Sequence, residues 1–292
     1  MSKRRKSSPA EASKRQKPRD VFVPRPFAGL ADEPEWIALR ELVPAASARL
    51  TLRPDLVERY DNRPVTLATV LPMAWPAMAK PDGRIFIGLQ RHVQSGDVSR
   101  DLAVALVRAL ETTPGETVSV PVLPDHGPRL QDLLADEPLD VVMHGGFEFW
   151  LDEPASDDPN VTASLERANA SIYPTVRLAA ARAAYWCQVP EKAHVRWVLP
   201  EDEDTALDAL ARLSATGALL LGEGTKFAGM FRAHGLLVPV WDLPREAAAA
   251  EWEVPVADFA KRYADATSVT EPLTPVERRA RQGLLGRQIT LR

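Results

Sequence analysis

The stretch from Gly222 to Pro244, GEGTKFAGMFRAHGLLVPVWDLP, concentrates side chains that could do acid–base chemistry. It carries two acidic and three basic groups: Glu223, Lys226, Arg232, His234 and Asp242. These types predict a polar pocket if the protein is an enzyme. If it is not, they predict a core hairpin whose charges pair at its rim.

The same stretch predicts a β-hairpin that would position these groups. Two apolar runs, 227–233 and 236–241, flank His234 and Gly235, which suit a tight turn. Arg232 and His234 would then share one face near the end of the first strand. A short helix over 225–233 is the alternative.

Glycine and histidine spacing in the chain fails the common catalytic patterns. GEGTK, residues 222–226, lacks the G-x-x-x-x-G-K-[ST] spacing of a P-loop, and its Lys and hydroxyl residues stand in reversed order. Gly222, Gly224 and Gly229 likewise miss the dinucleotide fingerprint. G-x-S-x-G and H-E-x-x-H are absent. No two histidines stand four residues apart; they lie at 92, 126, 144, 194 and 234. We therefore predict no cofactor and no metal.

Positive charge gathers at both ends of the chain. Residues 1–19 hold eight Lys and Arg against Glu11, a net of +7, and residues 277–292 hold five Arg against Glu277, a net of +4. The whole chain of 292 residues has a formal net charge of −4, so residues 20–276 carry a net charge of −15. Such ends can bind phosphates, fold back on the acidic body or stay solvated.

Nucleic acid is one partner that these ends would suit. The cations available are Lys3, Arg4, Arg5, Lys6, Lys14, Arg15, Lys17, Arg278, Arg279 and Arg281. The first aromatic residue is Phe22, so the leading segment would contact phosphates without reading bases. Its Lys, Arg, Ser and Pro composition predicts that residues 1–20 are disordered.

The cysteine count and the hydropathy of the chain indicate the cellular compartment of the protein. The single Cys187 excludes an intrachain disulfide, which favours a reducing compartment, and its setting AAYWCQ predicts a buried helical position. The longest uncharged run, residues 64–79, has sixteen residues and three prolines, too few and too broken to span a bilayer. No secretory signal follows the basic start. We expect a cytoplasmic protein with no membrane partner.

Elements in the first half alternate between helix and strand. Periodicity, caps and turn residues predict helices over 34–43, 99–111 and 129–134, strands over 65–71, 84–89 and 117–122, and a hairpin over 139–151 turning at Gly145 and Gly146. The polar segment 152–160 then marks a domain junction or a long exposed loop.

In the second half, the alanine-rich segment 161–188 predicts helix, broken before Pro174. A strand over 193–199 follows, and then a helix that begins at the four acids 201–204, which suit a helix N-terminus better than a cation site. TPVE, residues 274–277, is a capping box that predicts a helix from 275 to about 285.

These elements predict an α+β, or mixed α/β, protein with two smaller subdomains of β-sheet plus helix. Their bounds are 21–152 and 160–270, after a tail of residues 1–20 and before a basic C-terminal helix and tail, 271–292. The strand, loop, helix order shared by 84–110 and 193–213 suggests a duplicated module.

Three segments carry a resemblance: PFAGLADEPEWIALRELVPA, LGEGTKFAGMFRAHGLLVPVWDLP and RRARQGLLGRQITLR. They resemble an actinobacterial family of proteins of unknown function, over most of the chain after residue 20. The resemblance implies a bacterial cytoplasmic protein whose basic start is the variable part, and it assigns no site.

Two functions follow as hypotheses. The first is a non-catalytic interaction protein whose basic termini contact nucleic acid or a ribonucleoprotein while the acidic body meets another protein. The alternative is an enzyme with a polar pocket near the hairpin from Gly222 to Asp242. We favour the first, because it requires no catalytic motif and the chain shows none.

Overall fold

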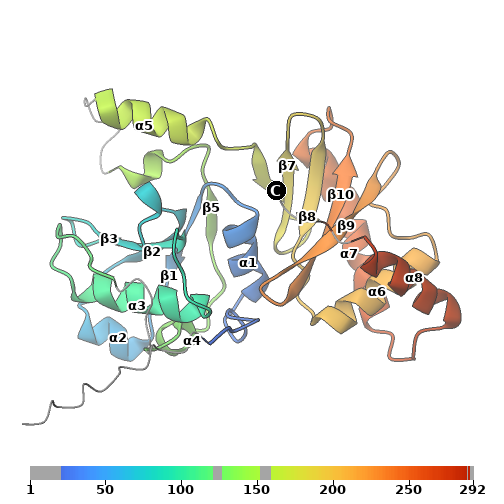
Figure 1. Ribbon diagram of the computed structural model, residues 1–292, viewed down its shortest axis with the longest axis horizontal. Helices are drawn as coiled ribbons and strands as arrows, with labels where there is room; N and C mark the ends of the chain where they lie inside the picture. The colour runs from blue at the N-terminus through green and yellow to red at the C-terminus, as the bar shows by residue number, and fades with distance from the viewer. Residues whose placement is uncertain (1–20, 121–126, 152–158, 288, 290–292) are drawn as a thin grey trace, which may run out of the picture.

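The computed structural model describes residues 21–120, 127–151, 159–287 and 289. Two five-stranded sheets, each with its own helices, lie on either side of helix α1 (Figure 1). This arrangement confirms the predicted α+β class. The predicted disordered tail, residues 1–20, and most of the predicted junction, 152–158, lie outside the described residues.

The first sheet has the strand order β3-β4-β2-β1-β5. Its strands are β1 (Ala46–Leu50), β2 (Val65–Val70), β3 (Ala77–Ala79), β4 (Ile85–Gln90) and β5 (Val141–Met143). β2 and β4 pair in parallel, and the other neighbours are antiparallel. β4 is buried over nearly its whole length, which fits its continuous apolar run.

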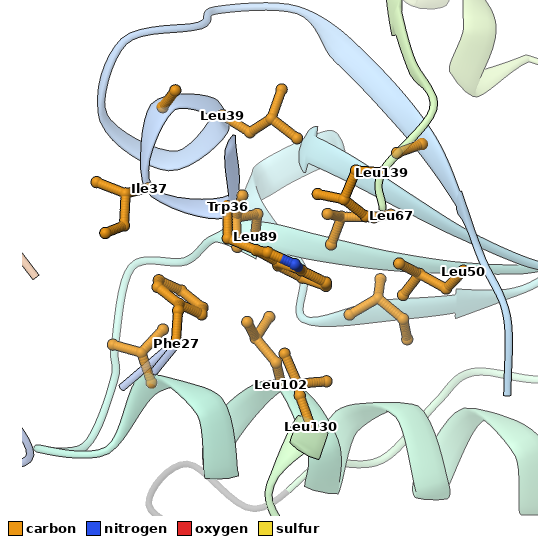
Figure 2. Packing of buried hydrophobic residues seen from close by; sticks show 14 of the residues in the cluster. Phe27, Trp36, Ile37, Leu39, Leu50, Leu67, Leu89, Leu102, Leu130 and Leu139 are labelled. Carbon is orange, nitrogen blue, oxygen red and sulfur yellow. The ribbon is translucent and has the colours of Figure 1, made fainter. Parts of the chain in front are cut away.

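Helices and apolar segments cover both faces of this sheet. Its helical elements are α1 (Glu33–Glu41), α2 (Pro54–Arg59), α3 (Val98–Glu111), α4 (Leu130–Leu133), α5 (Pro159–Asn169) and the 3₁₀ turns η1 (Pro72–Ala74) and η2 (Glu148–Trp150). Figure 2 shows Trp36 of α1 packed among sheet residues, with Leu102 of α3 and Leu130 of α4 below it. On the opposite face, Phe86 packs with Phe149 and Trp150 of η2.

The second sheet is antiparallel throughout, in the order β6-β7-β8-β10-β9. Its strands are β6 (Thr175–Arg177), β7 (Ala184–Gln188), β8 (Ala193–Trp197), β9 (Lys226–Ala233) and β10 (Leu236–Leu243). Its helical elements are α6 (Glu203–Ala215), η3 (Ala249–Trp252), α7 (Glu253–Thr267) and α8 (Pro275–Leu285). α6 and α7 pack on one face, against Trp197, Trp241 and Leu243.

The other face of the second sheet joins the first half. Tyr185, Val238 and Val240 belong to the same buried cluster as α1 and α3. The fully buried carboxylate of Glu35 in α1 accepts a hydrogen bond from the Tyr185 hydroxyl (2.6 Å), and Arg177 Nε lies 2.8 Å from the same oxygen. One apolar cluster therefore runs through both halves, and the predicted bounds 21–152 and 160–270 stay a prediction. Only the first sheet contains a parallel pair of strands, so the two sheet topologies do not support a duplicated module.

Local patterns predicted many of these elements correctly: α1, β2, β4, α3, α4, β8, α6, the β9–β10 hairpin and α8. The TPVE capping box is present, since the Thr274 hydroxyl accepts from Glu277 N and Glu277 accepts from Thr274 N. β1, β3, α2 and α7 were not predicted from local patterns.

Three element predictions were wrong. Residues 139–151 form no hairpin: β5 pairs with the distant β1, and the aromatic residues after Gly146 turn back onto the sheet in η2. Residues 117–120 contain no strand, and 121–122 lie outside the described residues. The predicted helix over 161–188 ends at Asn169, and β6 and β7 follow, because Tyr185 and Trp186 pack on opposite faces of a sheet.

In the described part of the chain, no helix is both long and apolar enough to cross a membrane.

Candidate functional site at the β9–β10 hairpin

The predicted hairpin is present and turns at the predicted residues. β9 and β10 pair from Ala233 and Leu236 outward, and His234 and Gly235 both take left-handed backbone angles (φ 47° and 87°) at the turn. A side chain at Gly235 would place its Cβ 3.0 Å from Cβ of Arg25. Glycine therefore lets the N-terminal segment lie against the turn.

Arg232 and His234 each lie beside a carboxylate from another element. Arg232 Nε donates to Glu203 Oε2 of α6 (2.7 Å), and Nε2 of His234 lies 2.8 Å from Glu41 Oε1 of α1. All four side chains line one cavity of about 760 Å³. The structure thus brings together two predicted site residues and two acids, Glu41 and Glu203, that were not predicted to belong to this pocket.

Electrostatics favours the charged forms of Glu203, Arg232 and Glu41. The hydrogen bond from Arg232 lowers the pKa of Glu203 and raises that of Arg232 itself. Burial acts to raise the pKa of Glu41, but the hydrogen bond and charge of His234, with Arg40, outweigh it, and the net shift is downward. A general base for neutral pH needs a pKa raised toward 7. Both carboxylates are shifted the other way, so they suit ion pairing better than proton transfer.

The other three predicted pocket residues lie at the far end of the hairpin. Lys226 and Asp242 face each other across the strands, and Glu223 is exposed in the turn before β9. Asp242 follows Gly235 by seven positions, which places the two ends of the hairpin roughly 20 Å apart along extended strands. The five residues therefore do not converge on one site.

The GEGT turn has its own internal partners. The Thr225 hydroxyl donates to the Gly222 carbonyl (2.7 Å) and lies 3.2 Å from Gly222 N. These bonds close the turn on itself, which agrees with the failed P-loop spacing.

Asp242 belongs to a polar row that crosses the sheet. Lys192 Nζ lies 2.7 Å from Asp242 Oδ2, and His194 Nδ1 lies 3.0 Å from Asp242 Oδ1. Strand register continues this row through His194 to Cys187 and Thr175. Cys187 is buried, as predicted, but on a strand rather than a helix. Since β6 and β7 were not predicted, the row could not be found in the sequence.

The two ends of the described chain meet at the same cavity. Phe22, Val23, Pro24 and Ile289 line it together with Arg232 and His234. Val23 N donates to the Gly96 carbonyl (2.8 Å), which fixes the N-terminal segment beside the loop before α3.

The C-terminal segment pairs with the free edge of β9. Met230 N donates to the Arg287 carbonyl (3.1 Å), and Ile289 N donates to the Met230 carbonyl (3.0 Å). A Cβ on Gly229 would lie 2.3 Å from the Arg287 carbonyl oxygen, so this close approach requires glycine at position 229. The hairpin therefore holds both ends of the described chain.

The predicted nucleic-acid contacts on α8 differ in their availability. Arg281 binds Asp204 (2.6 Å) and Asp208 (2.7 Å) of α6, which neutralises its charge within the fold. Arg278 is exposed and donates to the Leu273 carbonyl. Arg279 is exposed and meets no hydrogen-bond acceptor among the described residues. The predicted contacts in the tail, Lys3, Arg4, Arg5, Lys6, Lys14, Arg15 and Lys17, lie outside the described residues.

The four acids at residues 201–204 each have a partner. Asp202 caps α6 by accepting from Thr205 N, Glu201 accepts from the Tyr263 hydroxyl, and the other two bind Arg232 and Arg281. In the described ranges, no group of three or more His, Cys, Asp or Glu side chains is placed to hold a metal ion.

The fold and the site define an α+β protein of two five-stranded sheets, joined through α1 and a hairpin whose charges are paired. The chain belongs to the family described as "Family of unknown function (DUF5926)", whose profile matches residues 26–292. Neither the curated proteins nor the solved structures contain a match to this chain.

Proposed function

We propose that this protein is a non-catalytic interaction protein whose two basic ends contact one polyanion, nucleic acid or a ribonucleoprotein. The observation that carries the proposal is the meeting of residues 22–24 and Ile289 at one cavity on the β9–β10 hairpin. Residues 1–19, with a net charge of +7, and the basic C-terminal residues therefore begin from neighbouring points.

Neighbouring origins matter because they raise the effective concentration of one cationic end at a phosphate chain already bound by the other. Counterion release gives each phosphate contact a similar, sequence-independent share of the affinity. Arg281 is excluded from this set by its bonds to α6, so the C-terminal contribution comes from Arg278, Arg279, Arg287 and Arg292.

A non-catalytic role is supported by the state of the hairpin charges. Arg232, His234 and Asp242 each lie within an ion-pair distance of an oppositely charged or titratable partner. Charges paired in this way stabilise the rim of the hairpin and have a structural role. The −15 charge of residues 20–276 further suits a basic protein partner for the body. We place this activity in a bacterial, actinobacterial cytoplasm, in keeping with the single cysteine.

The test is the salt dependence of binding to a short mixed-sequence single-stranded RNA, measured by fluorescence anisotropy with the full chain. One variant replaces Lys3, Arg4, Arg5 and Lys6 with Gln, a second replaces Arg278, Arg279, Arg287 and Arg292 with Gln, and a third combines both sets. If each cation contacts a phosphate, either set lowers the slope of log K against log salt by about 3. The combined variant loses both contributions.

A matched control removes four exposed arginines elsewhere, Arg49, Arg53, Arg59 and Arg245. It has the same net charge as either test variant, so a loss confined to the ends separates local contact from overall charge. Equal slopes in the wild type, the two end variants and the control contradict the proposal. Affinity purification with and without nuclease then shows whether protein partners are held through nucleic acid.

The enzyme alternative keeps one supporting observation, the shared cavity of Arg232, His234, Glu41 and Glu203. A bound anionic substrate would have to displace Glu203 from Arg232. A metabolite that raises the melting temperature of the wild type, but not of Arg232→Gln, would favour this alternative over the interaction protein.

A further inference from the structure

A second cavity, of about 200 Å³, lies between the end of α1 and the second sheet. Its walls include Glu41 and Gln90 from the first half, and Tyr173, Thr175, Cys187 and Arg196 from the second. Arg196 and Cys187 stand on the sheet face that turns toward the first half, beside the polar row through His194. The cavity is thus part of the junction between the two halves.

Arg196 is the unusual member of this wall. Its Nε atom is buried and has no hydrogen-bond partner among the described residues, and no described carboxylate lies within ion-pair distance of its guanidinium. On the same side of the sheet, Arg177 lies 2.8 Å from Glu35, and Arg182 binds Asp32. Arg196 is half-buried, and a buried Nε–H without an acceptor is unfavourable, so an acceptor supplied by a ligand would stabilise it.

Other charges near the cavity are already balanced. Glu41 lies between Nε2 of His234 (2.8 Å) and Nε of Arg40 (3.3 Å). Burial raises the pKa of the Cys187 thiol, and the positive charge of Arg196 acts against that rise. One uncompensated positive charge therefore faces the cavity. A single cation suits a monoanion better than a phosphate dianion.

The volume of the cavity and the shape of its walls restrict the class of ligand further. An apolar cavity of about 150 Å³ holds a benzene molecule, so this one admits a compound of only a few more heavy atoms. Leu42, Val43, Pro44 and Val189 supply apolar walls. The planar guanidinium matches both oxygens of a carboxylate. We propose that this cavity binds a small monocarboxylate, with its carboxylate on Arg196 and its apolar part against these walls.

Cys187 provides a direct probe, because it is the only cysteine of the chain and it lines the cavity. Iodoacetate and iodoacetamide alkylate a thiolate by the same displacement: sulfur bonds to the methylene carbon and iodide leaves with the electron pair of the C–I bond. Only iodoacetate carries a carboxylate. The measured quantity is the ratio of the two alkylation rates at Cys187, folded and then unfolded in urea.

We expect the iodoacetate-to-iodoacetamide ratio to be roughly tenfold higher in the folded chain, since charge-assisted hydrogen bonds contribute about that much. Arg196→Gln should return the ratio to the unfolded value, and Arg196→Lys should keep part of the preference if the glutamine variant fails to fold. Arg245→Gln is the matched control: its backbone carbonyl accepts from Gln188, next to Cys187, but its side chain does not line the cavity.

Competition completes the test. Acetate or propionate should slow the alkylation of Cys187 by iodoacetate in the wild type and not in Arg196→Gln. A ratio that is equal in the folded and unfolded wild type overturns the proposal, as does stronger protection by inorganic phosphate than by propionate. A folded Cys187 that reacts with neither reagent also overturns it, because the cavity would then not admit a molecule of this size.

Discussion

The two faces of the second sheet differ in what they bury. The face toward α6 and α7 is apolar, with Trp197, Trp241 and Leu243 packed against helix residues. The face toward the first half has an apolar centre around Tyr185 and Val238, and polar or charged groups around it. The first face holds the second half of the molecule together. The second face, called the joining face below, packs against the first half, and the cavities lie along this junction.

Polar groups on the joining face form pairs across the junction instead of being replaced by apolar residues. Glu35 lies beside Tyr185 and Arg177, Asp32 binds Arg182, and Glu41 lies beside His234. Such pairs add directional specificity, but each leaves an uncompensated group when one partner is lost. Arg196 stands out against this pattern, because the described residues offer it no acceptor.

The largest effect should come from Trp241→Ala on the apolar face. Trp241 is fully buried, contacts the rings of Phe227 and Phe259, and donates from Nε1 to the Leu219 carbonyl (2.9 Å). Removing the indole should lower the free energy of unfolding by about 3–5 kcal/mol, from the transfer and cavity contributions together. Urea denaturation measures it, and Trp241→Phe, which keeps most of the packing, should lose less. Equal stability of both variants would contradict this role of the apolar face.

Glu35→Ala tests the joining face and should have the next largest effect. It leaves the buried Tyr185 hydroxyl and the partly exposed Arg177 without their carboxylate, so we expect a loss of about 3 kcal/mol. Tyr185→Phe alone should cost about 1 kcal/mol, the typical net contribution of one hydrogen bond.

A double-mutant cycle separates this contact from general damage to the fold. Because Glu35 and Tyr185 are in contact, the loss in the double variant should fall short of the sum of the single losses by about 1 kcal/mol. Additive losses would show that the hydrogen bond does not stabilise the junction.

Local sequence patterns were sufficient for the hairpin but not for its surroundings. Alternating apolar residues and His234-Gly235 predicted β9, β10 and their turn, and a capping box predicted α8. The partner of His234, however, is Glu41, 193 residues away in the chain, and no local pattern encodes that contact. β6 and β7 were missed because their flanking alanines favour helix, while pairing with β8 decides the outcome. The cavity at Arg196 is lined by residues of β6, β7 and β8 together with Glu41 at the end of α1, so no single local pattern could locate it.

The smallest effect concerns His194 and pH. Burial lowers the pKa of His194 below its ordinary 6.5, with help from the charges of Arg196 and Lys192 and against the attraction of Asp242. The unfolded chain then binds the proton more readily than the folded chain does, so stability is complete above pH 6.5 and decreases as the pH falls toward the folded pKa. His194→Gln should flatten this part of the profile of unfolding free energy between pH 5 and pH 8. His144, whose pKa burial also lowers, contributes with the same sign in both chains, so the difference between wild type and variant isolates His194. If the unfolding free energy of the variant has the same slope against pH as that of the wild type, His194 is as open to water in the folded chain as in the unfolded one. The polar row on the joining face would then not be buried.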